Sequence, residues 1–194
     1  MAVVSQRTRS DAVRNRDAVV NAAIELLAEN PAASMQDIAA ASGLGRTTVY
    51  RHFPSRETLL VSLFERVVEE AQRISAQIIA EGGGPERILR RMGFEFVLLG
   101  GRFRFLSSFR DQTTVLEESK IAPHDPVADF IRDGQACGDL RDDLPLLWTQ
   151  SMIQAMSIAA TDDVAAGRFE AQTAGELLGE SFVALLLGCD RARD

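Results

Sequence analysis

A short run of polar side chains in the first third of the chain suggests recognition of DNA rather than catalysis. Arg46, Thr47 and Thr48 come first: arginine bonds guanine through both O6 and N7, and threonine contacts the thymine methyl group. Tyr50 and His52 follow, and their hydroxyl and imidazole groups suit phosphate oxygens. We interpret the run as a helix that reads base edges with its first turn and holds the DNA backbone further along. The alternatives are core packing for Tyr50 and a surface histidine with satisfied hydrogen bonds for His52.

Two short helices joined by a glycine-containing turn are expected to position these side chains. Ser34 is suited to cap the first helix, with Asp37 at its third position reaching back to it. Gly43 can take the left-handed conformation that ends this helix. The second helix buries Val49 and ends before Pro54, which forbids continuation. This is the helix-turn-helix arrangement, whose second helix enters the major groove of DNA.

Helical periodicity continues along the rest of the chain without strand alternation, so the expected fold class is all-α. Residues 1–10 show no periodicity, and we expect a disordered arm that either touches DNA or is solvated without a role. Gly100 and Gly101 are expected to end the fifth helix, and Gly134 to fray the seventh. About nine helices are predicted: from Asp11 or Arg14 to Glu29, two within 34–52, then 55–81, 85–99, 102–110, 127–136, 144–167 and 170–188.

The charge of the chain is unevenly distributed. Its 194 residues carry a net charge of −7, which taken alone disfavours DNA binding. Residues 1–56, however, contain seven arginines and five acids, whereas residues 57–194 contain fourteen bases and twenty-three acids. The positive density that phosphate requires is therefore expected at the N-terminal end only.

The composition fits a soluble globular protein, with 46% apolar and 25% charged residues. Arginines interrupt the N-terminal segment, so no signal peptide is expected, and no apolar run is long enough for a membrane span. The two cysteines, Cys137 and Cys189, are expected to be free thiols in a reducing cytosol. We therefore expect a cytoplasmic protein without membrane association.

Four stretches of the sequence resemble the TetR (tetracycline-repressor) family of bacterial transcriptional regulators. They are residues 16–23 (RDAVVNAA), 36–39 (QDIA), 43–44 (GL) and 48–53 (TVYRHF). The most specific part is the run 50–60, YRHFPSRETLL. The resemblance implies an N-terminal three-helix DNA-binding domain, residues 1–56, joined by a long helix to a helical ligand-binding and dimerisation domain, residues 57–194. The implied partners are double-stranded operator DNA, a second copy of the chain and an unknown small-molecule effector.

The resemblance also adds residues to the expected DNA contacts. Gln36 matches a family position that reaches a base or a phosphate, and Arg56 matches a phosphate-contacting position at the start of the long helix. Gly45 stands where the family usually has Ser or Thr, so a possible hydroxyl contact near the DNA is lost. The expected DNA-binding set is Gln36, Arg46, Thr47, Thr48, Tyr50, Arg51, His52 and Arg56.

Methionine and aromatic side chains in the second domain suggest an apolar cavity between helices. Both kinds of side chain adapt to ligands, and the resemblance implies that the fold holds one. The alternative is plain core packing. The expected effector-pocket set is Met92, Phe96, Phe103, Phe105, Phe109, Trp148, Met152 and Met156.

Small residues repeat every four positions on the last two expected helices. Glycine inside a helix costs about 1 kcal/mol against alanine, so two on one face suggest close helix approach. A four-helix bundle, with two helices from each subunit, would use such faces. The alternative is tight packing inside one subunit. The expected dimer-interface set is Ser151, Ala155, Ala159, Gly175, Leu178, Gly179, Phe182 and Leu186.

The sequence thus favours a ligand-released transcriptional repressor that binds a pseudo-palindromic operator as a homodimer. A second possibility is a helix-turn-helix regulator controlled by a protein partner. A helical enzyme is the weakest, because the two histidines, His52 and His124, lie far apart without nearby cysteines or paired carboxylates at metal-ligand spacing. We expect no catalytic residues, no metal and no cofactor.

Overall fold

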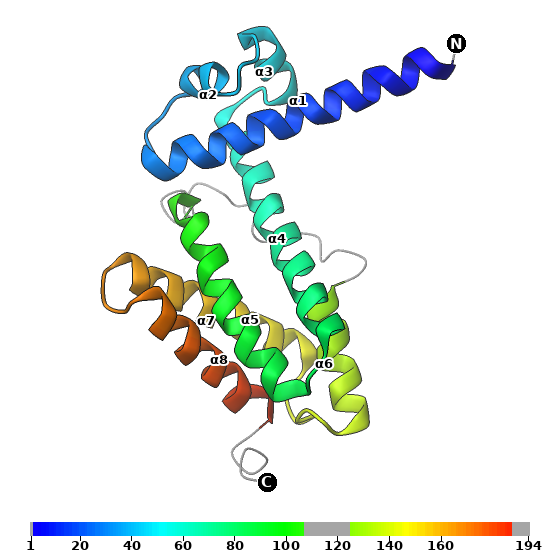
Figure 1. Cartoon of the computed structure of the whole chain (residues 1–194), viewed down its shortest axis with the longest axis vertical. Coiled ribbons are helices and arrows are strands. Elements are labelled where there is room, and N and C mark those ends of the chain that lie inside the picture. The colour runs from blue at the N-terminus through cyan, green and yellow to red at the C-terminus, as the bar shows by residue number, and fades with distance from the viewer. Residues whose placement is uncertain (1, 107–124, 188–194) are drawn as a thin grey trace. The chain divides into compact units, whose positions relative to one another are not determined.

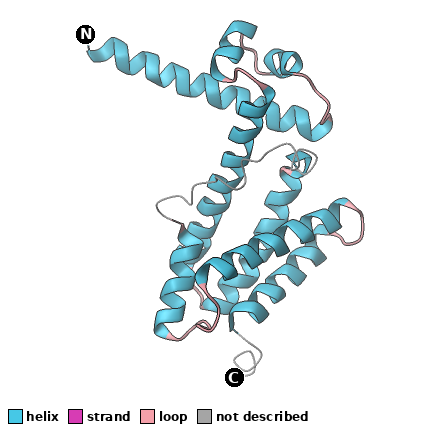
Figure 2. Cartoon of the chain, turned by 180° about the vertical axis from the view of Figure 1, so that it is seen from behind, coloured by secondary structure: helices cyan, strands magenta, loops and turns pink. Residues whose placement is uncertain are grey.

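A computed structural model describes residues 2–106 and 125–187, with side chains from residue 11 onward, as helices joined by turns (Figure 1). No strand occurs in these ranges (Figure 2), and the expected all-α class is confirmed. None of their helices is long and apolar enough to cross a membrane. The helices are α1 (Ala2–Glu29), α2 (Met35–Ala41), α3 (Arg46–His52), α4 (Arg56–Glu81), α5 (Pro85–Arg102), α6 (Pro126–Cys137), α7 (Leu146–Ala165) and α8 (Ala171–Leu187).

Helix α1 differs from the expectation of a disordered arm, because it begins at Ala2. Neither glycine nor proline occurs between Ala2 and Glu29, so nothing in the sequence interrupts the helix once it has formed. The expected helix 102–110 is seen only as a 3₁₀ turn over 104–106. The remainder of that segment, with Phe109, lies outside the described residues, as do His124 and Cys189.

The first compact unit contains residues 2–66 with Phe105 and Leu106. Its core follows the predicted periodicity of α1 and of the two short helices. The unit continues past residue 56, where the sequence-based boundary lies, because Leu59, Leu60 and Leu63 in the first turns of α4 are fully buried. Burial of these side chains removes apolar surface from water and joins the start of α4 to the N-terminal helices. Other buried members are Val20, Ala23, Ile24, Leu27, Met35, Ile38, Val49 and Phe53.

The second compact unit contains residues 67–104 and 125–187. Helices α5 and α8 lie side by side, and α7 packs against both (Figure 1). The close approach uses glycines: a Cβ on Gly179 of α8 would lie 2.7 Å from the carbonyl oxygen of Arg90 in α5. The surrounding core includes Ile78, Leu89, Met92, Ile131, Leu178, Phe182 and Leu186.

Glycine in this unit marks close packing more often than helix ends. Helix α5 continues through Gly100 and Gly101 to Arg102, contrary to the expected end, and the missing side chain of Gly100 leaves room for Thr161 of α7. Gly134 does not fray α6: it is buried, and a Cβ there would lie 2.6 Å from the Leu140 side chain. The helix ends instead at Gly138, whose φ of 83° is left-handed.

Candidate nucleic-acid interface

Helix α2 begins with the predicted capping box. Ser34 Oγ accepts a hydrogen bond from the Asp37 backbone N–H at 3.2 Å, and Asp37 Oδ2 accepts one from the Ser34 backbone N–H at 2.8 Å. The bonds from Ser34 hold the pKa of Asp37 below its ordinary value, the side-chain bond first and the backbone bond second. Two otherwise unpaired N–H groups at the start of α2 are thereby satisfied.

The turn between α2 and α3 also follows the prediction. Gly43 takes a φ of 68°, and Gly45 caps α3 without a side-chain hydrogen bond. Val49 is completely buried and anchors α3, while Phe53 is buried at its C-terminal end. Helix α3 therefore has one fixed side toward the core, formed by Val49.

Several polar side chains of α3 lie on its outer surface. Arg46, Thr47 and Arg51 are exposed, and Thr48 is partly exposed. Tyr50 is also only partly buried, and the Arg46 guanidinium carbon lies 5.4 Å from the centre of its ring. The neighbouring Val49, by contrast, is completely buried. Gln36 is exposed on α2.

His52 ends α3 in an unusual environment. Its Nε2 atom is buried and has no hydrogen-bond partner among the described residues. The alternative of a satisfied surface histidine therefore does not describe this nitrogen. A buried polar atom without a partner costs free energy.

Arg56 has bonds inside the protein. Its Nη2 donates to the Pro31 carbonyl oxygen at 2.9 Å, and its Nη1 donates to the Ala33 carbonyl oxygen. These carbonyls belong to the turn between α1 and α2. The resemblance implied a phosphate contact for Arg56, but nothing in the sequence signals these bonds to a turn more than twenty residues earlier.

Seven of the eight expected pocket residues lie within the described ranges, and they differ in burial. Met92 is buried in the core of the second unit, where Phe96 meets Phe182 edge-on with ring centroids 6.1 Å apart and Met156 packs nearby. Phe103 is also buried in this unit and Met152 is half-buried, whereas Phe105 belongs to the first unit. Trp148 is 58% exposed. Met92 is thus buried in a core cluster, whereas Trp148 is a surface residue.

The expected dimer-interface residues separate into two groups. Those on α7 are exposed: Ser151, Ala155 and Ala159. Those on α8 are buried within the chain, where its glycines allow close contact with α5. They are Gly175, Leu178, Gly179, Phe182 and Leu186.

Three large apolar side chains are exposed on the surface of these helices, and two of them, Leu147 and Leu177, are not among the expected site residues. Leu147 and Trp148 at the start of α7 are 67% and 58% exposed, and Leu177 on α8 is 48% exposed. The signal was present in α8, because Leu177 lies beside Leu178, so one of the two adjacent leucines must point away from α5. Together with the exposed small residues of α7, they make up the exposed apolar surface of α7 and α8, which we call the apolar outer face.

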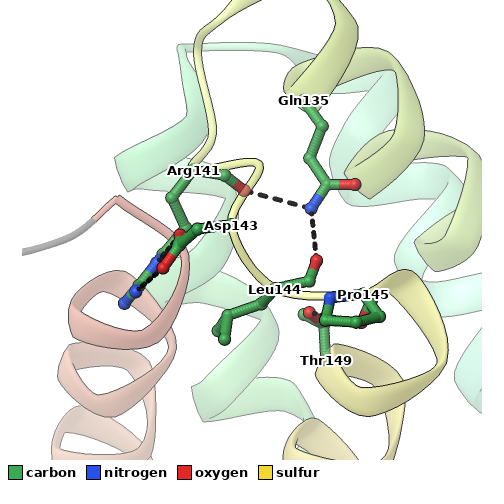
Figure 3. A network of polar contacts seen from close by, with 6 residues as sticks. All are labelled: Gln135, Arg141, Asp143, Leu144, Pro145 and Thr149. Carbon is green, nitrogen blue, oxygen red and sulfur yellow. Dashed lines mark hydrogen bonds and ion pairs between the residues drawn. The ribbon is translucent and has the colours of Figure 1, made fainter.

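A polar network fixes the connection that leads into this face. Gln135 Nε2 donates to the carbonyl oxygens of Arg141 and Leu144, each at 3.0 Å (Figure 3). Arg141 Nε donates to Asp143 Oδ1 at 2.6 Å, and this hydrogen bond holds the pKa of Asp143 below its ordinary value. The α6–α7 connection therefore has its backbone carbonyls paired just before α7 begins.

The N-terminal helices match known regulators in sequence. Residues 19–63 match the model of a family described as bacterial regulatory proteins, tetR family. The HTH-type transcriptional repressor LfrR of Mycolicibacterium smegmatis is 38% identical over 79 residues, which are 41% of this chain and 42% of LfrR. The matched segment therefore spans less than half of this relative.

The fold is similar over most of the chain. The TetR-like transcriptional regulator LfrR from Mycobacterium smegmatis, in complex with proflavine, aligns with a TM-score of 0.64 and 24% identity over 89% of this chain and 94% of that chain. The transcriptional regulator FadR from Bacillus subtilis, in complex with stearoyl-CoA, aligns with a TM-score of 0.67 and 22% identity over 88% and 97%. The likeness in fold thus includes the helices of the second unit.

Proposed function

We propose that this chain, which belongs to the TetR family of bacterial regulatory proteins, is a transcriptional repressor in the cytoplasm. In this proposal it binds a pseudo-palindromic DNA operator as a homodimer and is released by a small, largely apolar ligand. The observation that carries the proposal is the orientation of α3. Val49 is completely buried, while Arg46, Thr47 and Arg51 are presented to the outside.

The first turn of α3 would read base edges in the major groove, with Arg46 on guanine and the threonines on thymine methyl groups. Tyr50, Arg51 and His52 would hold phosphates. Gln36 of α2 would reach the same DNA from the preceding helix. Gly45 contributes no side chain, so discrimination would rest on the residues that follow it.

A homodimer would place two copies of α3 on the operator. Half-sites of such motifs lie roughly 34 Å apart or at multiples of that distance. The apolar outer face of α7 and α8 supports this assembly, because Leu147, Trp148 and Leu177 expose large apolar side chains that a second copy would cover. Because the same face meets itself across a two-fold axis, the assembly closes at two copies.

The proposed effector would bind in the second unit. Phe96 and Met156 pack at the edge of its core and are only partly buried, so they can move to admit an apolar molecule. Structures of LfrR in complex with proflavine and of FadR in complex with stearoyl-CoA share this fold, which supports a bound organic ligand. The ligand would release DNA by binding more tightly to a state that does not fit the operator.

Selection of fragmented genomic DNA by the purified full-length chain tests the proposal. We expect enrichment of a short pseudo-palindromic sequence. The variant Arg46→Ala/Thr47→Ala, which alters two exposed side chains, serves as the matched control and should not enrich it. Equal recovery of all fragments by the wild type would contradict the proposal.

A thermal-shift screen with apolar metabolites tests the effector separately. A ligand that raises the melting temperature should also release the selected DNA. If the chain binds its operator and no small molecule causes release of the DNA, control by a protein partner would be favoured.

A further inference from the structure

The first turns of α4 are bonded to α1 and to the turn that follows it by two arginines. Arg56, the first residue of α4, donates through its two Nη atoms to the carbonyl oxygens of Pro31 and Ala33. Ala33 is buried, so water does not readily replace the guanidinium there. The turn that leads into the N-cap of α2 is thus held by the start of α4.

Arg16 makes the second connection, from the middle of α1. Its Nη2 donates to Ser62 Oγ of α4 at 2.8 Å and lies 3.5 Å from Glu65 Oε2. The guanidinium carbon also lies 5.6 Å from the ring centre of Phe53, the residue that caps the C-terminal end of α3. The ion pair with Glu65 is exposed and therefore weak. The hydrogen bond to Ser62 and the contact with Phe53 are the interactions that position Arg16.

The two arginines hold the recognition unit at both of its ends. Arg56, which is the first residue of α4, bonds to the backbone before α2. Arg16 contacts the residue after α3 and is hydrogen-bonded to the first turns of α4. All of these residues belong to one compact unit. Helix α3 therefore has its orientation relative to α4 defined by side-chain bonds as well as by the apolar core.

We propose that Arg16 and Arg56 are positioning residues for DNA recognition, which act through these bonds within the protein rather than by neutralising phosphates. This inference rests on the proposed function and assigns Arg56 a role that differs from the phosphate contact expected from the sequence. The chemistry requires arginine, because its planar fork reaches two carbonyls at once. Lysine keeps the charge but has a single ammonium group.

Salt dependence separates the two roles of Arg56. A lost phosphate contact reduces the slope of log K against log salt by about 0.9, whereas a lost bond inside the protein releases no counterions. We expect Arg56→Ala and Arg56→Lys each to weaken binding to the DNA selected by the wild type by about tenfold, the effect of one charge-assisted hydrogen bond, with unchanged slope. Arg16→Ala should behave in the same way.

The matched controls are two other exposed arginines. Arg51→Ala on α3 should reduce the slope, and Arg73→Ala in the second part of α4 should change neither affinity nor slope. A wild-type affinity of Arg56→Lys, or a slope reduced by about 0.9 in Arg56→Ala, would overturn the positioning role.

Amide hydrogen exchange of the free full-length chain gives a readout that does not depend on DNA. The Ala33 N–H donates to the Asn30 carbonyl and the Ala32 N–H to Asn30 Oδ1 in the turn that Arg56 holds. We expect Arg56→Lys to exchange faster at these two amides, with the amides of α7 unchanged. Unchanged exchange at Ala32 and Ala33 would overturn the inference. Failure of the wild type to select any DNA would instead contradict the proposed function, and exchange would then decide the positioning role alone.

Discussion

Gly179 of α8 lies directly against the backbone of Arg90 in α5, where a Cβ would come within 2.7 Å of the carbonyl oxygen and 2.8 Å of the Cα atom. The stripe of small residues on α8 is therefore an internal packing surface. Gly179 and its buried neighbours face α5, whereas Leu177, two residues before Gly179, is exposed. The contact of Gly179 with α5 and the exposure of Leu177 together show which side of α8 remains available to a partner.

Gly179→Ala is expected to lower the free energy of unfolding by about 1–3 kcal/mol, because backbone atoms cannot move aside as a flexible side chain can. Gly101→Ala is the control: a Cβ there meets nothing within 4 Å, and the residue lies in α5. Replacing a helical glycine in open space should stabilise the protein by about 0.5–1 kcal/mol. Urea unfolding measures both values. Equal effects of the two variants would contradict the close α5–α8 approach.

Trp148→Glu and Leu177→Glu should convert the expected dimer to a monomer, because each places a charge in an apolar surface that must be desolvated on association. Ala136→Glu, an exposed position on α6, should leave the dimer intact. Sedimentation equilibrium gives the mass. Trp148 is the one tryptophan of the chain, so its emission should shift to longer wavelength when the wild type is diluted and dissociates. A wild-type mass that is monomeric at all concentrations would contradict the interface.

Gly45→Ser is expected to raise the free energy of unfolding by about 0.5–1 kcal/mol, since serine caps a helix better than glycine and restricts the unfolded chain. The backbone permits it, with φ of −61° and ψ of 140° and no atom within 4 Å of the new Cβ. Gly43→Ser is the control, and it should destabilise because φ there is 68°. Thermal unfolding compares the two. A destabilised Gly45→Ser would show that Gly45 is required for another reason.

The capping box at Ser34 should make stability depend on pH. The pKa of Asp37 is lowered in the folded chain, so its charged form stabilises the fold above the unfolded pKa of about 3.9 and this contribution is lost as pH falls through the folded pKa. The difference in unfolding free energy between wild type and Asp37→Ala should therefore be constant near pH 7 and should shrink toward pH 3. A difference independent of pH would contradict the role of the carboxylate.

Local sequence signals predicted the N-terminal unit well. The caps, the turn and the buried side of α3 follow from residue type and spacing, because the residues that produce them act on their own backbone or on the next turn. These residues are Ser34, Gly43, Val49 and Pro54. The bonds of Arg56 could not be predicted in this way, because they join backbone carbonyls distant in the sequence.

The second unit was harder to predict because glycine and apolar stripes have several uses. Gly100 and Gly134 were read as helix ends, whereas both accommodate a neighbouring side chain. Trp148 was assigned to a cavity and lies on the surface. Periodicity identifies a face of a helix, but only tertiary contacts show whether α5, solvent or a second copy covers it.

The most direct test of DNA reading by α3 is a fluorescence-anisotropy titration of the selected operator and of a scrambled duplex at fixed salt. The wild type should prefer the operator by about 10³-fold or more. Arg46→Ala/Thr47→Ala should lose most of this preference, while its binding to the scrambled duplex falls only as far as one lost positive charge requires. A double variant that retains the wild-type preference would contradict the assignment of α3 as the reading helix.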